Sequence, residues 1–280
     1  MQAARVVIAG GGAAGFFAAI TCAEAAPGTE VVVLEKGPQC LSKVRISGGG
    51  RCNVTHACFD SRSFAMNYPR GGQGMIGLLE RFQAHDTVEW FHRRGVKLKR
   101  EPDGRMFPVT DSSQTIIDCL LAAARAAGVT SRTNLGLAAA TRRAAGGFDL
   151  ALSDGSSLQC ARLLLATGGC RVAGMGQVAV SLGHNLESPV PSLFTVHVAT
   201  GWVRALAGVS VGDVEVSVPG ARLGARGALL LTHWGFSGPA ILRLSAWGAR
   251  ELHRADYRFP LRINWLPDRT EQSLGAELDA

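Results

Sequence analysis

Two stretches near the start of the chain, RVVIAGGGAAG (5–15) and EVVVLE (30–35), decide the fold. The β-branched runs at Arg5–Ala9 and Glu30–Leu34 are typical of strands buried in a parallel sheet. The small apolar residues of Ala13–Ala25 lie between them and favour a helix. This order predicts a β-α-β unit.

The turn between the first strand and the helix, GGGAAG (10–15), satisfies the GxGxxG pattern of dinucleotide-binding proteins. Gly10 permits the tight turn, Gly12 leaves space for a pyrophosphate, and Gly15 allows the helix to pack closely on the sheet. The free N–H groups of the helix N-terminus then face the phosphates. Glu35 ends the second strand, where a carboxylate accepts hydrogen bonds from a ribose. A tight turn without any ligand is the alternative.

A second signature favours FAD over NAD as the dinucleotide. A buried strand at 162–166 runs into the turn ATGG (166–169), behind alternating segments that predict an antiparallel meander at 137–142, 148–153 and 157–160. A β-α-β unit, a meander, a strand and an ATG-type turn form the plan of flavoproteins with two dinucleotide-binding folds. A dehydrogenase that uses NAD alone is expected to continue with regular β-α-β repeats.

The stretch ISGGGRCNVT (46–55) follows the expected ribose-binding acid. Three consecutive glycines indicate a backbone that passes close to a flat or charged group, although an ordinary flexible loop is the alternative. Arg51 is a candidate for phosphate binding, Asn53 and Thr55 for hydrogen bonds to the flavin, and Cys52 for a place beside the redox centre. The complete set of candidate cofactor-binding residues is Gly10, Gly12, Ala13, Ala14, Gly15, Glu35, Lys36, Lys43, Ser47, Gly48, Gly49, Gly50, Arg51, Cys52, Asn53, Thr167, Gly168 and Gly169.

These motifs resemble those of the bacterial aminoacetone-oxidase family of FAD-binding proteins, also called BaiN-like NAD(P)/FAD-dependent oxidoreductases. The similar stretches are GGGAAG (10–15), ISGGGRCNVT (46–55), GRMFPVTDSSQTIIDCL (104–120), LLLATGG (163–169) and LTHWGFSGPAIL (231–242). The resemblance implies an α/β fold: a Rossmann-like FAD domain of the glutathione-reductase type, with a second, β-rich inserted domain. We expect the FAD domain at 1–190 and part of the β-rich domain at 191–280.

The chain departs from this family in two places. After the ATGG turn the family usually continues with Ser-Tyr-Pro and Thr-Gly-Asp-Gly, whereas this chain has CRVAGMGQ (170–177). Members of the family also continue well beyond residue 280, into a Gly-rich segment that closes over the flavin. The resemblance therefore predicts a C-terminally truncated chain.

The remaining pattern predicts further elements. A Gly-rich loop is expected at 37–53, and a capping box of Asp111 and Gln114 should begin a helix at 115–127. Other expected elements of the first domain are helices at 75–82, 87–94 and 176–182 and a strand at 129–134. In the second domain we expect one helix at 239–254 with Ser237 as its N-cap, and a final helix that Asp268 and Glu271 cap. The expected strands lie at 194–198, 214–218, 228–232 and 257–264.

The net charge of +7 comes mainly from arginine, and its densest cluster is a charged loop expected between Arg93 and Arg105. Nucleic-acid binding uses such patches. However, no nucleic-acid motif accompanies the cluster and only 6% of the residues are aromatic, which favours a solvated face. We expect a small-molecule substrate and neither nucleic acid nor membrane as a partner, and the pattern leaves the oligomeric state open.

The seven cysteines include no CxxC pair, which argues against a disulfide scaffold or zinc site and favours a reducing cytoplasm. The histidines show no metal-binding spacing, no GxSxG elbow of a serine hydrolase occurs, and no apolar run is long enough to span a membrane. We expect no metal.

The pattern as a whole predicts an FAD-dependent oxidoreductase. It would pass electrons or a hydride through the flavin from NAD(P)H, as a transient donor, or from a small amine-like substrate. Cys52 and His233 are the catalytic candidates, His233 as a general acid or base. Two alternatives stay open: a flavin-linked disulfide reductase that uses Cys52 and Cys58, and a flavin-binding module without turnover.

Overall fold

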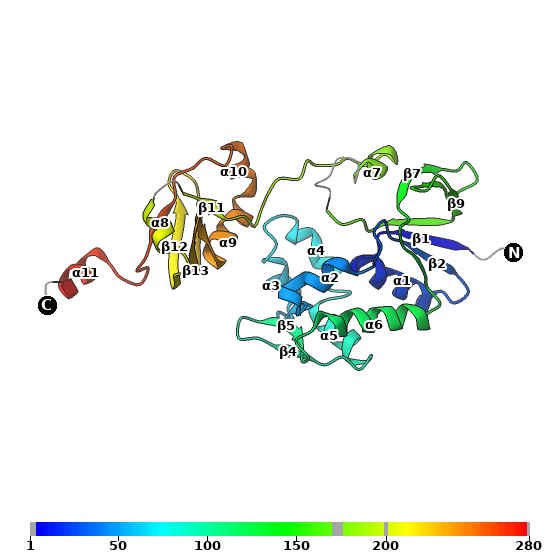
Figure 1. Cartoon of the computed structure of the whole chain (residues 1–280), viewed down its shortest axis with the longest axis horizontal. Helices are drawn as coiled ribbons and strands as arrows, with labels where there is room; N and C mark the ends of the chain where they lie inside the picture. The colour runs from blue at the N-terminus through cyan, green and yellow to red at the C-terminus, as the bar shows by residue number, and fades with distance from the viewer. Residues whose placement is uncertain (1–3, 170–175, 199–200, 279–280) are drawn as a thin grey trace. The chain divides into compact units, whose positions relative to one another are not determined.

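The computed structural model describes residues 4–169, 176–198 and 201–278 (Figure 1). The chain divides into two compact units, Met1–Glu187 and Ser188–Ala280. Each unit has a hydrophobic core of its own.

A four-stranded parallel sheet forms the centre of the first unit. Its strands are β1 (Arg5–Ala9), β2 (Glu30–Leu34), β6 (Thr130–Arg132) and β10 (Arg162–Leu165), in the order β10-β1-β2-β6. β1 pairs in parallel with both β2 and β10, which confirms the predicted β-α-β unit. The strand expected at 129–134 is confirmed, but it is shorter than predicted and spans only β6.

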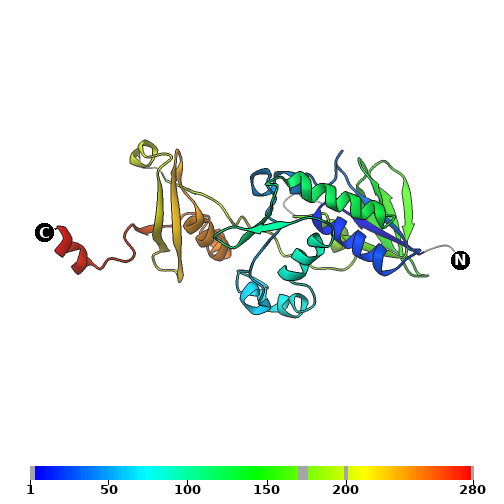
Figure 2. The same cartoon turned by 90° about the horizontal axis from the view of Figure 1, so that it is seen from below.

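One face of this sheet is covered by helices α1 (Ala13–Ala25) and α6 (Ser113–Ala126), which lie side by side (Figure 2). Ile8 and Val33 point towards this face and are almost completely buried in the core that the helices share with the sheet. The helix predicted at Ala13–Ala25 is confirmed at both ends.

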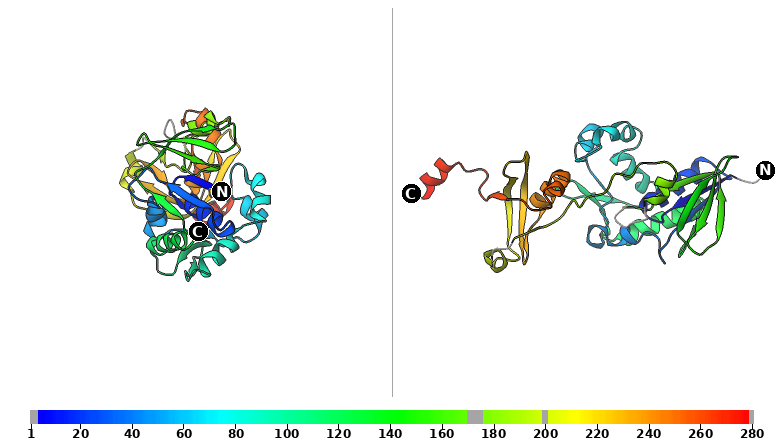
Figure 3. Two further views of the ribbon diagram at one scale, coloured as in Figure 1. Left: turned by 90° about the vertical axis from the view of Figure 1, so that its right-hand side faces the viewer. Right: turned by 90° about the horizontal axis from the view of Figure 1, so that it is seen from above.

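The opposite face is covered by the predicted antiparallel meander, which consists of β7 (Leu137–Arg142), β8 (Phe148–Leu152) and β9 (Ser157–Cys160). Val7 and Leu34 point towards it, because successive side chains of a strand alternate between faces. The left-hand view of Figure 3 shows the resulting three layers of helices, parallel sheet and meander. Because the helices cover one face of the parallel sheet and the meander covers the other, β1 and β2 are continuous apolar runs.

The segment predicted as a loop at 37–53 is instead partly helical. It contains α2 (Ser42–Ile46), followed by a tight turn at Ser47–Gly50 in which Gly48 and Gly49 are left-handed. The expected capping box of α6 is also wrong. Ser112 is the N-cap and its hydroxyl accepts a hydrogen bond from Gln114 N at 3.3 Å, whereas Asp111 forms ion pairs with Lys99 and Arg51.

The charged loop predicted between Arg93 and Arg105 is wrong as well. This segment contains β4 (Leu98–Arg100) and begins β5 (Arg105–Pro108), which form a small sheet with β3 (Thr55–His56). The other helices of the first unit are α3 (Ser61–Ala65), α4 (Gly72–Leu79), α5 (Ala84–His92) and α7 (Gln177–Ser181).

The second unit contains an antiparallel sheet with the order β11-β14-β13-β12-β15. Its strands are β11 (Val196–His197), β12 (Ser210–Val218), β13 (Leu223–Thr232), β14 (Gly235–Ser237) and β15 (Arg262–Asn264). The strand predicted at 257–264 is therefore confirmed only in its last part.

The single helix predicted at 239–254 is wrong. The chain forms α9 (Pro239–Trp247) and α10 (Ala249–Arg254), with Gly248 between them. A Cβ at Gly248 would lie 2.7 Å from Leu223 Cδ1 and 3.1 Å from Leu244 O, so a larger residue there would require the Leu223 side chain to move. The second unit also contains α8 (Gly201–Ala205) and α11 (Glu271–Leu278).

Two expected helix caps in the second unit are wrong. Ser237 belongs to β14, and Gly238, with φ of 95°, is the N-cap of α9. Before α11, the Thr270 and Ser273 side chains accept hydrogen bonds from each other's N–H groups, whereas Asp268 pairs with Arg226. Within the described parts of the chain, no helix is both long and apolar enough to cross a bilayer.

Candidate functional site

The turn from β1 into α1 leaves backbone N–H groups available to an anion. Gly12 is the N-cap of α1, no side chain caps the helix, and its first turn contains no acidic residue. Ala13 and Ala14 are exposed. Because the first N–H groups of a helix have no partner within the helix and carry its positive dipole end, this geometry fits a phosphate group.

The three motif glycines of this turn have different surroundings. A Cβ at Gly10, whose φ is 117°, would overlap Ala166 O, and a Cβ at Gly15 would overlap Gly10 O. A Cβ at Gly12 would meet no atom within 4 Å. Gly10 and Gly15 are therefore required by the packing of the turn itself, while Gly12 faces open space into which a cofactor pyrophosphate fits.

Glu35 holds this turn through its two carboxylate oxygens. Oε2 accepts a hydrogen bond from Gly11 N at 2.8 Å, and Oε1 accepts one from Gly37 N at 2.7 Å. The sequence predicted a ribose contact for this residue, and its bonds to the turn are an additional role. A carboxylate oxygen has more than one lone pair, so these bonds leave acceptor capacity for a ribose.

The glycine-rich segment has a left-handed backbone. Gly48, Gly49 and Gly50 have φ of 56°, 69° and 86°, a conformation that favours glycine. A Cβ at Gly48 would meet Asn53 N and Phe107 Cε1 at 2.9 Å, whereas one at Gly49 or Gly50 would meet nothing within 4 Å. Gly48 is thus constrained by packing, and the next two glycines leave an open surface.

Arg51 is tied to the hairpin of β4 and β5. Its guanidinium lies 4.0 Å above the Phe107 ring, and its Nη1 is 3.1 Å from Glu101 and 3.4 Å from Asp111. The sequence predicted a phosphate contact for Arg51. That contact stays a prediction, and the protein contacts of Arg51 position the glycine-rich segment against the small sheet.

Cys52 is buried directly after Arg51, and its N–H donates to Ser47 O at 3.0 Å. Burial raises the pKa of the Cys52 thiol, and a hydrogen bond with the Ser47 side chain offsets part of that rise. A buried thiol with a raised pKa stays protonated at neutral pH, which disfavours the disulfide-exchange alternative. Neither Cys52 nor Cys58 is in a disulfide.

The side chain of Asn53, another predicted flavin contact, is exposed. Its amide nitrogen can donate hydrogen bonds to Thr55 O and Met106 O.

We expect iodoacetamide to alkylate Cys52 slowly in the folded protein. Because its pKa is raised, its thiolate fraction at about pH 8 is below that of an ordinary cysteine, and it grows only at higher pH. Peptide mapping after timed alkylation measures the rate, with the urea-unfolded chain as the control. Equal rates for the folded and unfolded chains would contradict this assignment.

The ATGG turn lies beside the glycine turn of β1, since Ala166 N donates to Ala9 O at 2.8 Å. Thr167, Gly168 and Gly169 are exposed, and Lys43 Nζ would be 3.3 Å from a Cβ at Gly168. Lys43 of α2 therefore brings a positive charge to the carboxyl end of the sheet. Residues 170–175 of the segment that departs from the family pattern lie outside the described residues.

Lys36 and Cys40 lie in the segment that follows Glu35. The exposed Lys36 packs its stem near Gly136, and Cys40 Sγ would be 2.9 Å from a Cβ at Gly11. Burial and, to a smaller extent, the charge of Glu35 raise the pKa of the Cys40 thiol. Cys40 was not predicted as a site residue, because nothing in its local sequence distinguishes it from the other cysteines.

His233, the other catalytic candidate, lies in the second unit. It occupies the turn between β13 and β14, is exposed, and has its ring centroid 6.5 Å from that of Trp234. Cys52 belongs to the first unit, so these two candidates come from separate units.

Comparison with known proteins places these features in a family. The model described as "HI0933-like protein Rossmann domain" matches residues 4–218, and "HI0933-like protein barrel and H2TH domain" matches residues 190–280. The chain belongs to the HI0933-like family. This confirms the expected relationship to the BaiN and aminoacetone-oxidase-like FAD-dependent oxidoreductases. The expected fold class, a Rossmann-like parallel sheet with a separate β-rich domain, is confirmed as well.

Two curated relatives align with nearly the whole HI0933-like chain. It is 30% identical over 278 residues to the ribosomal RNA dihydrouridine synthase of Escherichia coli, an alignment covering 96% of this chain and 65% of the relative. It is 27% identical over 272 residues to the 3-dehydro-bile acid delta(4,6)-reductase of Clostridium scindens, covering 94% and 65%. The chain thus spans about two thirds of the length of these relatives.

A solved structure of a flavocytochrome c3 fumarate reductase in its open conformation shares the fold. Its TM-score is 0.53 at 22% identity, over 75% of this chain and 47% of the other.

Proposed function

We propose that this HI0933-like chain contributes to an FAD-dependent reductase that adds hydrogen across a carbon–carbon double bond conjugated to a carbonyl group. The names of the two relatives support this reaction. A dihydrouridine synthase and a delta(4,6)-reductase act on unlike molecules, yet both names denote the addition of hydrogen to an unsaturated ring. These names therefore favour reduction over the amine oxidation that was also expected from the sequence.

The observation that carries the cofactor assignment is the open space at Gly12, next to uncapped N–H groups at the start of α1. These groups would hold the pyrophosphate, with Lys43 nearby as a counter-charge, and Glu35 would hold the ribose. The open backbone at Gly49 and Gly50 would lie against the flavin. When bound, FAD supplies the hydride-transfer chemistry.

The proposed overall reaction balances with NAD(P)H as the transient donor. The donor loses one hydride and becomes NAD(P)+, and the substrate gains that hydride and one proton at the two carbons of its double bond. The six cysteines described as free are consistent with a reducing cytoplasm as the place of this reaction.

The primary substrate candidate is a small conjugated carbonyl compound. Uridine within RNA is a second candidate, favoured by the 30% identity to the ribosomal RNA enzyme. The first unit also carries nearly all of the net charge of +7, which would attract the phosphates of RNA.

An anaerobic titration of the purified chain tests this function. We expect a visible flavin spectrum that is bleached by NADPH or NADH and that recovers when an oxidised substrate is added. A conjugated steroid ketone and an unmodified ribosomal RNA transcript, added in separate experiments, distinguish the two substrate classes, and an amine donor in place of NAD(P)H tests the other expected reaction. A colourless protein, or bound FAD that no donor bleaches, would contradict the proposal and favour the flavin-binding module without turnover.

A further inference from the structure

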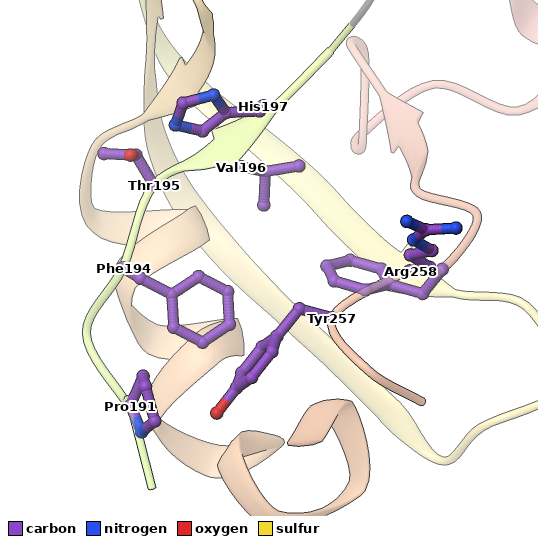
Figure 4. Close-up of a pocket in the computed structure, with 8 residues that line it drawn as sticks. Pro191, Phe194, Thr195, Val196, His197, Tyr257 and Arg258 are labelled. Carbon is purple, nitrogen blue, oxygen red and sulfur yellow. The ribbon is translucent and has the colours of Figure 1, made fainter. Parts of the chain in front are cut away.

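The second unit contains a cavity of about 610 Å³, which lies within the range of small-molecule binding sites. It is formed where the segment leading into β11 meets the segment between α10 and β15 (Figure 4). Its lining residues are Pro191, Phe194, Thr195, Val196, His197, Tyr257, Arg258 and Phe259. All of them belong to the second unit, so the cavity is complete without the first.

Aromatic rings form the apolar part of the wall. The rings of Phe194 and Tyr257 meet edge to face, with centroids 5.4 Å apart and planes at 87°, and Figure 4 shows them beside each other. Both side chains are half-buried and pack against the core of the second unit, as do Val196 and Phe259. A wall that is anchored in the core and built from rings favours a flat hydrophobic ligand.

The polar groups at the cavity lack partners. The Tyr257 hydroxyl is buried and has no hydrogen-bond partner within the described part of the chain. Arg258 and His197 are exposed, and their side chains form no hydrogen bond or ion pair with any described residue. A buried hydroxyl without a partner is costly, so native structures rarely leave one in this state without a reason.

The backbone beside Tyr257 is strained. Asp256 and Tyr257 have φ of 49° and 56°, so two consecutive residues other than glycine are left-handed. Strain of this kind persists only where the surrounding structure enforces it, and it is frequent at ligand-binding positions. Here it places Tyr257 and Arg258 on the cavity wall.

We propose that this cavity binds a planar aromatic carboxylate. The ring would lie against Phe194 and Tyr257, and its carboxylate would pair with the Arg258 guanidinium, which matches the geometry of a carboxylate with two parallel N–H donors. Arg258 is the one permanently charged side chain in the lining, so the cavity matches a singly charged carboxylate better than a doubly charged phosphate.

Isothermal titration calorimetry of the full chain with 2-naphthoate tests this site without requiring FAD or turnover. We expect saturable one-site binding and at least a tenfold loss of affinity in Arg258→Gln. The matched control is Arg254→Gln, an exposed arginine of α10 that does not line the cavity, which should bind 2-naphthoate as the parent does. The neutral alcohol 2-naphthalenemethanol should bind the parent chain at least tenfold more weakly than 2-naphthoate does.

Absence of saturable 2-naphthoate binding would overturn the proposal, as would equal affinity of Arg258→Gln and the parent. Circular dichroism shows whether each variant is folded. Because the binding measurement does not involve the flavin, its failure is distinguishable from failure of the proposed reductase activity.

Discussion

Gly12→Val is expected to abolish FAD binding while leaving the folded chain as stable as the parent. Gly12 has an extended backbone with φ of −86°, and a Cβ there would meet no protein atom within 4 Å. The added side chain therefore costs the protein little. It would instead fill the space at the start of α1 where the pyrophosphate must approach the backbone.

The expected loss of FAD affinity is about 100-fold or more, which corresponds to about 3 kcal/mol. It is measured as the flavin absorbance retained after desalting and by titration of the apoprotein, and urea unfolding reports stability. The matched control is Gly77→Val in α4, another glycine whose Cβ would meet open space. Equal FAD binding by the two variants would show that the pyrophosphate does not approach Gly12.

Gly15→Ala is expected to have the opposite signature, a large loss of stability with or without FAD. A Cβ at Gly15 would overlap Gly10 O and lie 3.4 Å from Ile8 Cγ2. Both neighbours belong to β1 and the turn that follows it, and Gly10 O is part of the backbone, so the clash is relieved only by moving α1 away from the sheet. Overpacking of this kind costs about 3 kcal/mol.

Urea unfolding followed by circular dichroism measures this loss for the apoprotein. Gly12→Ala is the control, because it adds the same methyl group to the same turn at a position with open space. If Gly15→Ala proved as stable as Gly12→Ala, the close contact between α1 and β1 would be refuted.

The central β-α-β unit was predictable because its information is local. The β-branched runs of β1 and β2 and the small apolar residues of α1 each determine one element, and the glycines between them determine the turn. The meander was predictable for the same reason, since its strands alternate and are separated by Gly-rich or Asp-Gly turns.

The helix caps were less predictable, since several polar residues at one place compete for the same role. Asp111 and Ser112 both precede α6 and both are good N-caps. The structure uses Ser112, because Asp111 is held by Lys99 and Arg51 from other elements. Gly248 similarly is the C-cap of α9, inside a stretch whose apolar pattern predicted one continuous helix.

The sequence alone determined the central strands, the glycine turn and the family, because each strand, turn and motif is recorded in residues that are close together in the chain. Only the tertiary structure decided the contacts of individual site residues: Glu35 with Gly11, Arg51 with Phe107 and Glu101, and the cavity around Tyr257. The physical reason is that the energy of such contacts comes from side chains and backbone groups that the fold brings together from distant positions, and no periodicity in the chain records which partner each will meet.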